Sequence, residues 1–201
     1  MKLKSNKYKT ILFFGPPGSG KSTQAKLLDK KKFFYISTGE LLRHMRDGAE
    51  FQSGALGKKI TKIMEAGGLV PDRTMIDLLF RYLSQAVSEG IFKPDKQILI
   101  FDGIPRNTTQ IRMLNDHVQV IQIIDIHFSS DSILKERIRK RAVQEGRSDD
   151  KNRGIIEKRL AIYKNETAEV LKHYPKNIIY KINGDDSVKE INQQIKNILN
   201  N

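Results

Sequence analysis

The sequence contains no cysteine, which excludes disulfides and thiolate zinc sites and fits a reducing compartment. It also lacks any long apolar run. The apolar segment that follows its basic first ten residues covers only residues 11–14, too few for a signal peptide or a membrane span. We therefore expect a cytoplasmic protein without zinc and without a membrane partner.

Acidic residues are scarce: 23 Asp and Glu stand against 36 Lys and Arg, for a formal net charge of +13. A basic chain can attract nucleic acid. However, the lysine-rich segments at residues 2–9 and 30–32 carry only one aromatic residue, Tyr8, and no series of aromatic platforms for base stacking. Charge alone supplies only salt-sensitive adhesion. We expect no specific nucleic-acid partner, but a solvated basic surface and arginines that bind small phosphate ligands.

Residues 15–22, GPPGSGKS, match the phosphate-binding pattern G-x-x-x-x-G-K-[ST] between a predicted strand and a predicted helix at residues 21–28. Glycines allow consecutive backbone N–H groups to converge on one anion. The Lys21 side chain can then reach the outer phosphates, and the Ser22 hydroxyl can ligate Mg²⁺. We interpret residues 15–22, the phosphate-binding loop, as a nucleotide site.

Apolar strand-like runs alternate with helical patterns along the whole chain. Alternation of this kind predicts one doubly wound α/β domain with a parallel five-stranded sheet. The expected strands are residues 11–14, 33–37, 97–102, 118–128 and 177–182. The expected helices are residues 21–28, a helix from about residue 38, and residues 71–89, 130–142, 153–174 and 188–199, with a small helical excursion over residues 47–68.

Asp102 ends the third predicted strand. Ligands of open parallel sheets gather outside the carboxyl ends of the strands, so this carboxylate is placed to hold Mg²⁺ or its waters. The alternative is a turn or N-cap aspartate before Gly103.

Arginines fall near the predicted ends of several elements. Guanidinium groups make bidentate contacts with phosphate oxygens, although any single one could equally form a surface ion pair. Arg137 and Arg141 are four residues apart on a helix and repel each other unless an anion lies between them. Phosphoryl transfer depends on alignment of the reactants and on positive charge more than on a catalytic base. The four histidines, which could supply such a base, form no evident catalytic group in the sequence. The arginines concerned are Arg43, Arg106, Arg137, Arg141, Arg147 and Arg159.

Several ordered motifs together resemble the adenylate kinase family of nucleoside monophosphate kinases, in its short-lid form. They are GPPGSGKSTQ at residues 15–24, STGELLR at 37–43, GGLVPD at 67–72, FDGIPR at 101–106 with Gln110, ERIRKR at 136–141, RSDD at 147–150 and KRL at 158–160. The resemblance implies reversible transfer of the γ-phosphoryl of Mg-ATP to AMP, giving two ADP. It also implies a monomer whose small-molecule partners are ATP and AMP.

The resemblance further implies roles for individual residues. The catalytic residues would be Lys21, Arg106, Arg137, Arg147 and Arg159. ATP would be bound by Gly15, Gly18, Ser19, Gly20, Lys21, Ser22, Thr23, Arg137 and Arg141. AMP would be bound by Thr38, Arg43, Gly68, Leu69, Val70, Gly103, Ile104, Pro105, Arg106, Gln110, Arg147 and Arg159. The residues themselves, rather than the resemblance, predict that Ser22 and Asp102 hold Mg²⁺, partly through water. Residues 38–70 would form a mobile AMP-binding insertion, and residues 143–152 a short lid.

Four features depart from the family pattern. Ser22 and Gly68 stand where Gly and a basic residue are common, Ile104 replaces a Phe, and residues 44–57 form a longer stretch than usual. A UMP/CMP kinase is an alternative, because those enzymes resemble this chain in the phosphate-binding loop and the arginines, although Thr38 and Gln110 favour AMP. An alternative from another class is a nucleotide- or nucleic-acid-binding protein that uses the same phosphate-binding loop.

Overall fold

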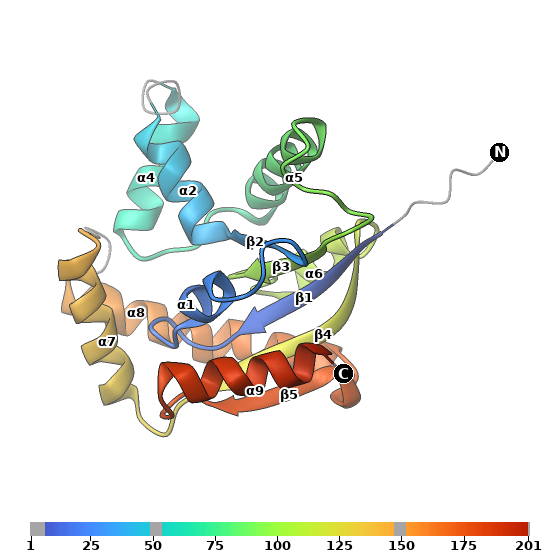
Figure 1. The fold of residues 1–201 in the computed structure, drawn as a ribbon. Helices are drawn as coiled ribbons and strands as arrows, with labels where there is room; N and C mark the ends of the chain where they lie inside the picture. Colours follow the sequence, from blue (N-terminus) through green and yellow to red (C-terminus); the bar gives the residue numbers. More distant parts are fainter. Residues whose placement is uncertain (1–6, 49–53, 147–151, 201) are drawn as a thin grey trace.

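The structure, a computed structural model, describes residues 7–48, 54–146 and 152–200. Its centre is a five-stranded parallel sheet with the strand order β2-β3-β1-β4-β5 (Figure 1). The strands are β1 (Tyr8–Phe14), β2 (Phe33–Ser37), β3 (Ile98–Asp102), β4 (Val118–His127) and β5 (Ile179–Asn183). The predicted α/β class and the five parallel strands are confirmed.

Strand β1 lies at the middle of the sheet and is apolar on both faces. Leu12 and Phe14 pack into one cluster of buried side chains, and Ile11 and Phe13 pack into another. Alternate residues of a strand point to opposite faces, so these clusters lie on the two sides of the sheet. Burial on both faces explains why the sequence shows a continuous apolar run rather than an alternating one.

Helices cover both faces of the sheet. The cluster around Ile11 includes Ala25 of α1 and Ile191 of α9, whereas the cluster around Leu12 includes Leu79 of α5 and Leu114 of α6. The helices are α1 (Lys21–Lys26), α2 (Thr38–Asp47), α4 (Ala55–Glu65), α5 (Asp72–Ser88), α6 (Thr108–Leu114), α7 (Asp131–Gln144), α8 (Arg153–Ile162) and α9 (Val188–Asn200). Within the described ranges, no helix is long and apolar enough to cross a membrane.

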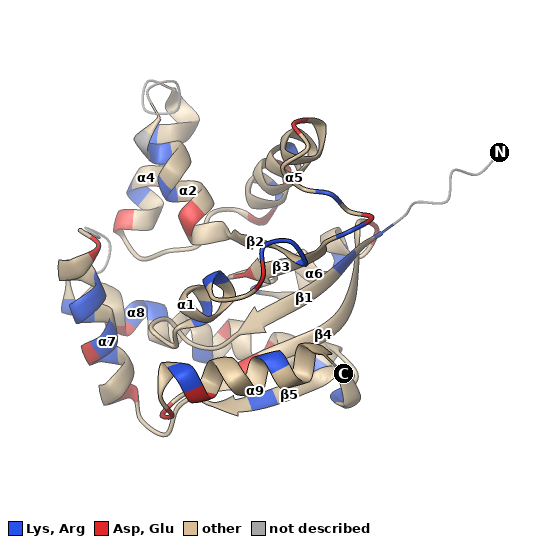
Figure 2. Cartoon of the chain, in the orientation of Figure 1, with Lys and Arg blue, Asp and Glu red and all other residues tan. Residues whose placement is uncertain are grey.

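Two pairs of helices project beyond the sheet. Helices α2 and α4 rise from the end of β2, while α7 and the start of α8 stand at another edge of the molecule (Figure 1). The α7–α8 pair has a small apolar cluster of its own, made by Leu134, Ile138, Ile156 and Leu160. Basic positions recur along α7 (Figure 2).

The predicted helix over residues 153–174 is broken into three kinds of helical structure. Helix α8 is followed by a π-helical turn, Tyr163–Thr167, and then by a 3₁₀ segment, Ala168–His173. Leu160 packs with α7, whereas Val170 belongs to the core beneath the sheet. Between these two residues the helix changes from α to π to 3₁₀ geometry. This change turns Leu160 toward one core and Val170 toward the other. A short 3₁₀ turn, Lys176–Ile178, leads into β5.

Candidate functional site

A cleft of about 410 Å³ lies at the carboxyl end of the sheet, where β1 and β3 end. It is lined by the phosphate-binding loop, the start of α2, the residues that follow β3, and side chains of α7 and α8. A smaller pocket of about 50 Å³ adjoins it between α2, the end of α4 and α5. Arg43, Arg106 and Arg159 line both spaces, so the two open onto a shared cationic boundary.

The phosphate-binding loop depends on glycine at three positions. Gly15, Gly18 and Gly20 have φ angles of +138°, +83° and +86°. A side chain at these angles is strained, and a Cβ at Gly15 would lie 2.5 Å from the carbonyl oxygen of Ile126. The loop therefore needs the two glycines that the motif prescribes, Gly15 and Gly20, and a further glycine at position 18.

Lys21 folds back over this loop. Its Nζ donates to the carbonyl oxygens of Gly15 at 2.8 Å and Pro16 at 3.0 Å, and to Ser19 Oγ at 3.1 Å. Burial lowers the pKa of Lys21 to about 8, an effect that Asp102 opposes and nearby arginines reinforce. The ammonium group is thus held in a position where its charged form is costly until an anion arrives.

Arg106 occupies the boundary between the cleft and the smaller pocket. Its Nε donates to the Gly103 carbonyl over 2.8 Å. Burial lowers the pKa of Arg106 to about 10; Arg159 and Arg43 lower it further, and Asp102 opposes them. Several guanidinium groups that repel one another around one space form an electropositive site suited to a multiply charged anion.

The smaller pocket is closed on one side by Thr38 and Gly103. Thr38 is 2% exposed, and its Oγ1 donates to the carbonyl oxygens of Gly103 at 3.1 Å and Asp102 at 3.3 Å. Gly103 has a φ of +85°, and a Cβ there would lie 2.7 Å from Thr38 Oγ1. The contact joins the first turn of α2 to the end of β3.

The residues singled out from the sequence converge on these two spaces. Those that line the larger cleft are Gly15, Gly18, Ser19, Gly20, Lys21, Ser22, Thr23, Arg43, Leu69, Asp102, Gly103, Ile104, Pro105, Arg106, Arg137, Arg141 and Arg159. Those that line only the smaller pocket are Thr38, Gly68, Val70 and Gln110. Arg147 lies outside the described residues.

Known proteins match the sequence of this chain over most of the residues that line the cleft. A family model described as adenylate kinase matches residues 13–179, which include every element that lines the cleft except the start of α9. The chain belongs to the adenylate kinase family. An adenylate kinase of a Prochlorococcus marinus strain is 40% identical over 195 residues, which cover 94% of this chain and 97% of that protein. An adenylate kinase of Porphyromonas gingivalis is 36% identical over 196 residues, which cover 94% of each chain.

Oxygen donors for a cation lie in this adenylate kinase cleft. The carboxylate of Asp102 is 7% exposed, and it lines the cleft together with Ser22. Carboxylate and hydroxyl oxygens are the ligands that Mg²⁺ prefers, so the donor set fits that ion bound together with phosphates. Among the described residues, no group of three or more His, Cys, Asp or Glu side chains gathers where it could hold a metal without a substrate.

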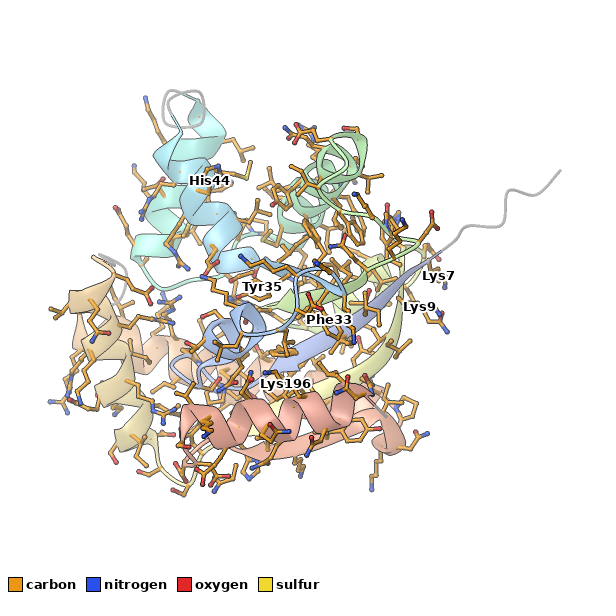
Figure 3. All side chains as sticks on the ribbon, in the orientation of Figure 1. Lys7, Lys9, Phe33, Tyr35, His44 and Lys196 are labelled. Carbon is orange, nitrogen blue, oxygen red and sulfur yellow. The ribbon has the colours of Figure 1, made fainter. Side chains whose placement is uncertain are left out.

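Tyr35 is a site residue that the sequence analysis missed. Its hydroxyl donates to Asp102 Oδ2 over 2.9 Å. Burial raises the pKa of Tyr35, and the charges of Asp102 and Glu40 raise it further, so the phenol stays protonated and acts as a donor. Figure 3 places Tyr35 between α1 and the base of α2. Ser37 pairs with Asp102 in the sheet, so alternation along β2 places Tyr35 on the same face as Asp102, but the sequence alone does not give this register.

Two further features were not foreseen. Asp72, at the first position of α5, accepts hydrogen bonds from Gln110 Nε2 at 2.7 Å and from Asn107 Nδ2 at 3.0 Å. Arg137 lies over the ring of Phe128, with its guanidinium carbon 4.7 Å from the ring centre. This cation–π contact helps to hold the Arg137 side chain in the position in which it lines the cleft.

Proposed function

We propose that this chain catalyses reversible transfer of the γ-phosphoryl group of Mg-ATP to AMP, giving two ADP. The γ-phosphorus would exchange its bond to the β-phosphate bridging oxygen for a bond to an AMP phosphate oxygen. The attacking oxygen is already ionised, so the reaction needs alignment and charge stabilisation rather than a base. The observation that carries the proposal is the shared boundary of Arg43, Arg106 and Arg159 between a large cleft and a smaller pocket.

The donor would lie along the phosphate-binding loop. Backbone N–H groups of residues 15–23 would hold the ATP phosphates, and Lys21 would exchange its contacts with loop carbonyls for contacts with the transferred group. Arg137 and Arg141 of α7 would bind the same phosphates from the opposite side. Support comes from their shared presence around one cleft.

The acceptor would occupy the smaller pocket. Arg43 and Arg106 would hold the AMP phosphate, Thr38 and Gln110 would lie beside its nucleoside, and Arg159 would face both nucleotides. The remaining members of the proposed AMP site are Gly68, Leu69, Val70, Gly103, Ile104, Pro105 and, outside the described residues, Arg147. Support comes from the residues that line the smaller pocket and from Arg43, Arg106 and Arg159, which line both this pocket and the cleft that contains Lys21.

A divalent cation belongs to the proposed reaction. Mg²⁺ would be held by Ser22 and, partly through water, by Asp102, and when bound it neutralises charge on the phosphates. Asp102 would orient this ion with the help of Tyr35, whose hydroxyl fixes one carboxylate oxygen. We propose no zinc, since the sequence offers no thiolate ligands.

Two segments are proposed to move during the cycle. Residues 38–70 would form the AMP-binding insertion, and residues 143–152 the short lid. Residues 49–53 and 147–151 lie outside the described residues, and Val143 and Gln144 belong to α7. Closure would exclude water, which competes with AMP for the same phosphoryl group. The position of α2 and α4 beyond the sheet supports an insertion of this kind (Figure 1).

A panel of acceptors tests the proposal. Phosphoryl transfer from Mg-ATP is measured with AMP, CMP, UMP and GMP at equal concentrations. We expect the highest kcat/KM with AMP. A pyrimidine nucleotide ranking above AMP would assign the chain to the UMP/CMP kinases instead.

The proposal also covers the oligomeric state, the compartment and the partners of the enzyme. We propose a monomer that works in the cytoplasm on ATP and AMP and binds no specific nucleic acid. Support comes from the cysteine-free sequence, which suits a reducing compartment. Light scattering of the purified chain, with and without nucleotides, measures its oligomeric state.

A further inference from the structure

Gln110 lies between two groups that fix the direction of its side-chain amide. The backbone N–H of Arg106 donates to Gln110 Oε1 over 2.8 Å, and Gln110 Nε2 donates to Asp72 Oδ1 over 2.7 Å. A backbone N–H can only donate, and an ionised carboxylate can only accept. Both contacts therefore require the same orientation, with the amide oxygen toward Arg106 and the nitrogen toward Asp72.

Asp72 is itself anchored by the next helix. Asn107 Nδ2 donates to both carboxylate oxygens of Asp72, at 3.0 and 3.2 Å. The oxygen of Asn107 accepts from the backbone N–H of Gln110 at 2.9 Å and caps α6. Asp72, Asn107 and Gln110 thus form a closed set of contacts between α5 and α6, and Gln110 is only 2% exposed.

The hydrogen-bond donor and acceptor that this amide still has available determine which nucleotide base it can bind. Gln110 lines the smaller pocket with one N–H and one oxygen lone pair still available. Adenine and cytosine each present an amino donor beside a ring-nitrogen acceptor, which matches that pair. Guanine and uracil present a carbonyl acceptor beside an N–H donor, so they would need the amide reversed.

We propose that Asp72 is a specificity-determining residue, because it fixes the Gln110 amide in the orientation that admits AMP and CMP and rejects GMP and UMP. The carboxylate acts through Gln110 and is therefore a positioning residue. Reversal of the amide would turn its oxygen toward a carboxylate that cannot donate. The inference rests on the proposed function, since it requires that the smaller pocket receives the acceptor base.

The variant Asp72→Asn tests this directly. A neutral amide at residue 72 can donate or accept, so only the Arg106 N–H still opposes the reversed orientation of Gln110. We expect the AMP/GMP and AMP/UMP ratios of kcat/KM to fall about tenfold, because a charge-assisted hydrogen bond has become a neutral one. The AMP/CMP ratio should stay unchanged, since both bases use the same orientation. Asp77→Asn, an exposed change in the same helix, is the matched control.

A second variant covers the case in which Asp72→Asn does not fold. Asn107→Ser keeps a hydroxyl that can cap α6 but removes both hydrogen bonds to Asp72. We expect a smaller fall in the same two ratios. General damage to the fold would lower turnover with all four acceptors and leave the ratios intact.

Dissociation constants for the four nucleoside monophosphates, from titration calorimetry without ATP, supply a readout independent of turnover. Unchanged AMP/GMP and AMP/UMP ratios in the folded variants would overturn the proposal. So would an AMP/CMP ratio that falls as far as AMP/GMP. A wild-type chain that binds AMP but does not phosphorylate it would contradict the proposed function instead, and the binding ratios would still decide the role of Asp72.

Discussion

At the scale of single residues, the site places basic side chains where burial disfavours their charged form. Burial lowers the pKa of Lys21 to about 8 and that of Arg106 to about 10. Among the groups that act on these two pKa values, the carboxylate of Asp102 is the one that raises both. Bound phosphates would add further negative charge and raise both pKa values again.

Proton uptake on ATP binding follows from the lowered pKa of Lys21. With a pKa of about 8, Lys21 should lose much of its charge in the free protein at pH 8.5, and bound triphosphate should raise the pKa again. We expect about half a proton or more to be taken up per Mg-ATP at pH 8.5, and much less at pH 7, where Lys21 is already protonated. The dependence of the binding enthalpy on the buffer measures this number. Equal uptake in wild type and in Lys21→Met would show that the proton goes elsewhere.

Tyr35 should affect the response to Mg²⁺ more than the chemical step. Tyr35→Phe removes the hydrogen bond to Asp102 and leaves the ring in place. We expect the Mg²⁺ concentration for half-maximal rate to rise about three- to tenfold, with kcat at saturating Mg²⁺ nearly unchanged. Mn²⁺ binding in the presence of ATP, followed by electron paramagnetic resonance, should weaken in parallel. Tyr180→Phe on β5 is the matched control, and an identical Mg²⁺ response in both variants would remove Tyr35 from the site.

At the scale of elements, two helices end in the same way but in different surroundings. In α4 and α5, Gly67 and Gly90 follow the last helical turn with φ angles of +66° and +70°. The N–H groups of the next residues, Gly68 and Ile91, bond back to Ile63 and Ala86. A Cβ at Gly67 would lie 2.8 Å from Ile155 of α8, whereas a Cβ at Gly90 would meet nothing within 4 Å.

This pair allows a matched comparison. Gly90→Ala should cost about 1 kcal/mol of folding free energy from the positive φ alone. Gly67→Ala should cost about 1–3 kcal/mol more, because the methyl group meets α8, and it should raise KM for AMP more than KM for ATP. Thermal unfolding and steady-state kinetics measure both effects. Equal losses in the two variants would mean that the approach of α4 to α8 contributes nothing.

Element boundaries show where sequence reasoning succeeds and where it fails. The strands were predicted because their apolar runs end at turn residues, and the glycines of residues 15–20 located the phosphate-binding loop. Helix α6 was not predicted, although Asn107 followed three residues later by Gln110 is an N-terminal helix signal. The π-helical turn at Tyr163–Thr167 was not predicted, since the helical spacing of residues 153–174 does not show that Leu160 and Val170 pack into separate cores.

At the scale of the whole molecule, residues far apart in the sequence meet because parallel strands end at one edge of the sheet. The motifs could be located individually from sequence, and Lys21, Asp102 and Arg106 do line one cleft. Their partners could not be located in this way. The Tyr35–Asp102 and Gln110–Asp72 contacts join residues 67 and 38 positions apart, and only the fold brings them together.

We propose that one continuous space holds two nucleotides end to end, with the phosphates between Lys21 and the arginines at the shared boundary. Titration with a mimic that joins two adenosines through five phosphates tests it most directly. We expect one tightly bound molecule per chain, competition with both ATP and AMP, and a strongly raised melting temperature. Binding that competes with ATP alone, or that leaves the melting temperature unchanged, would contradict it.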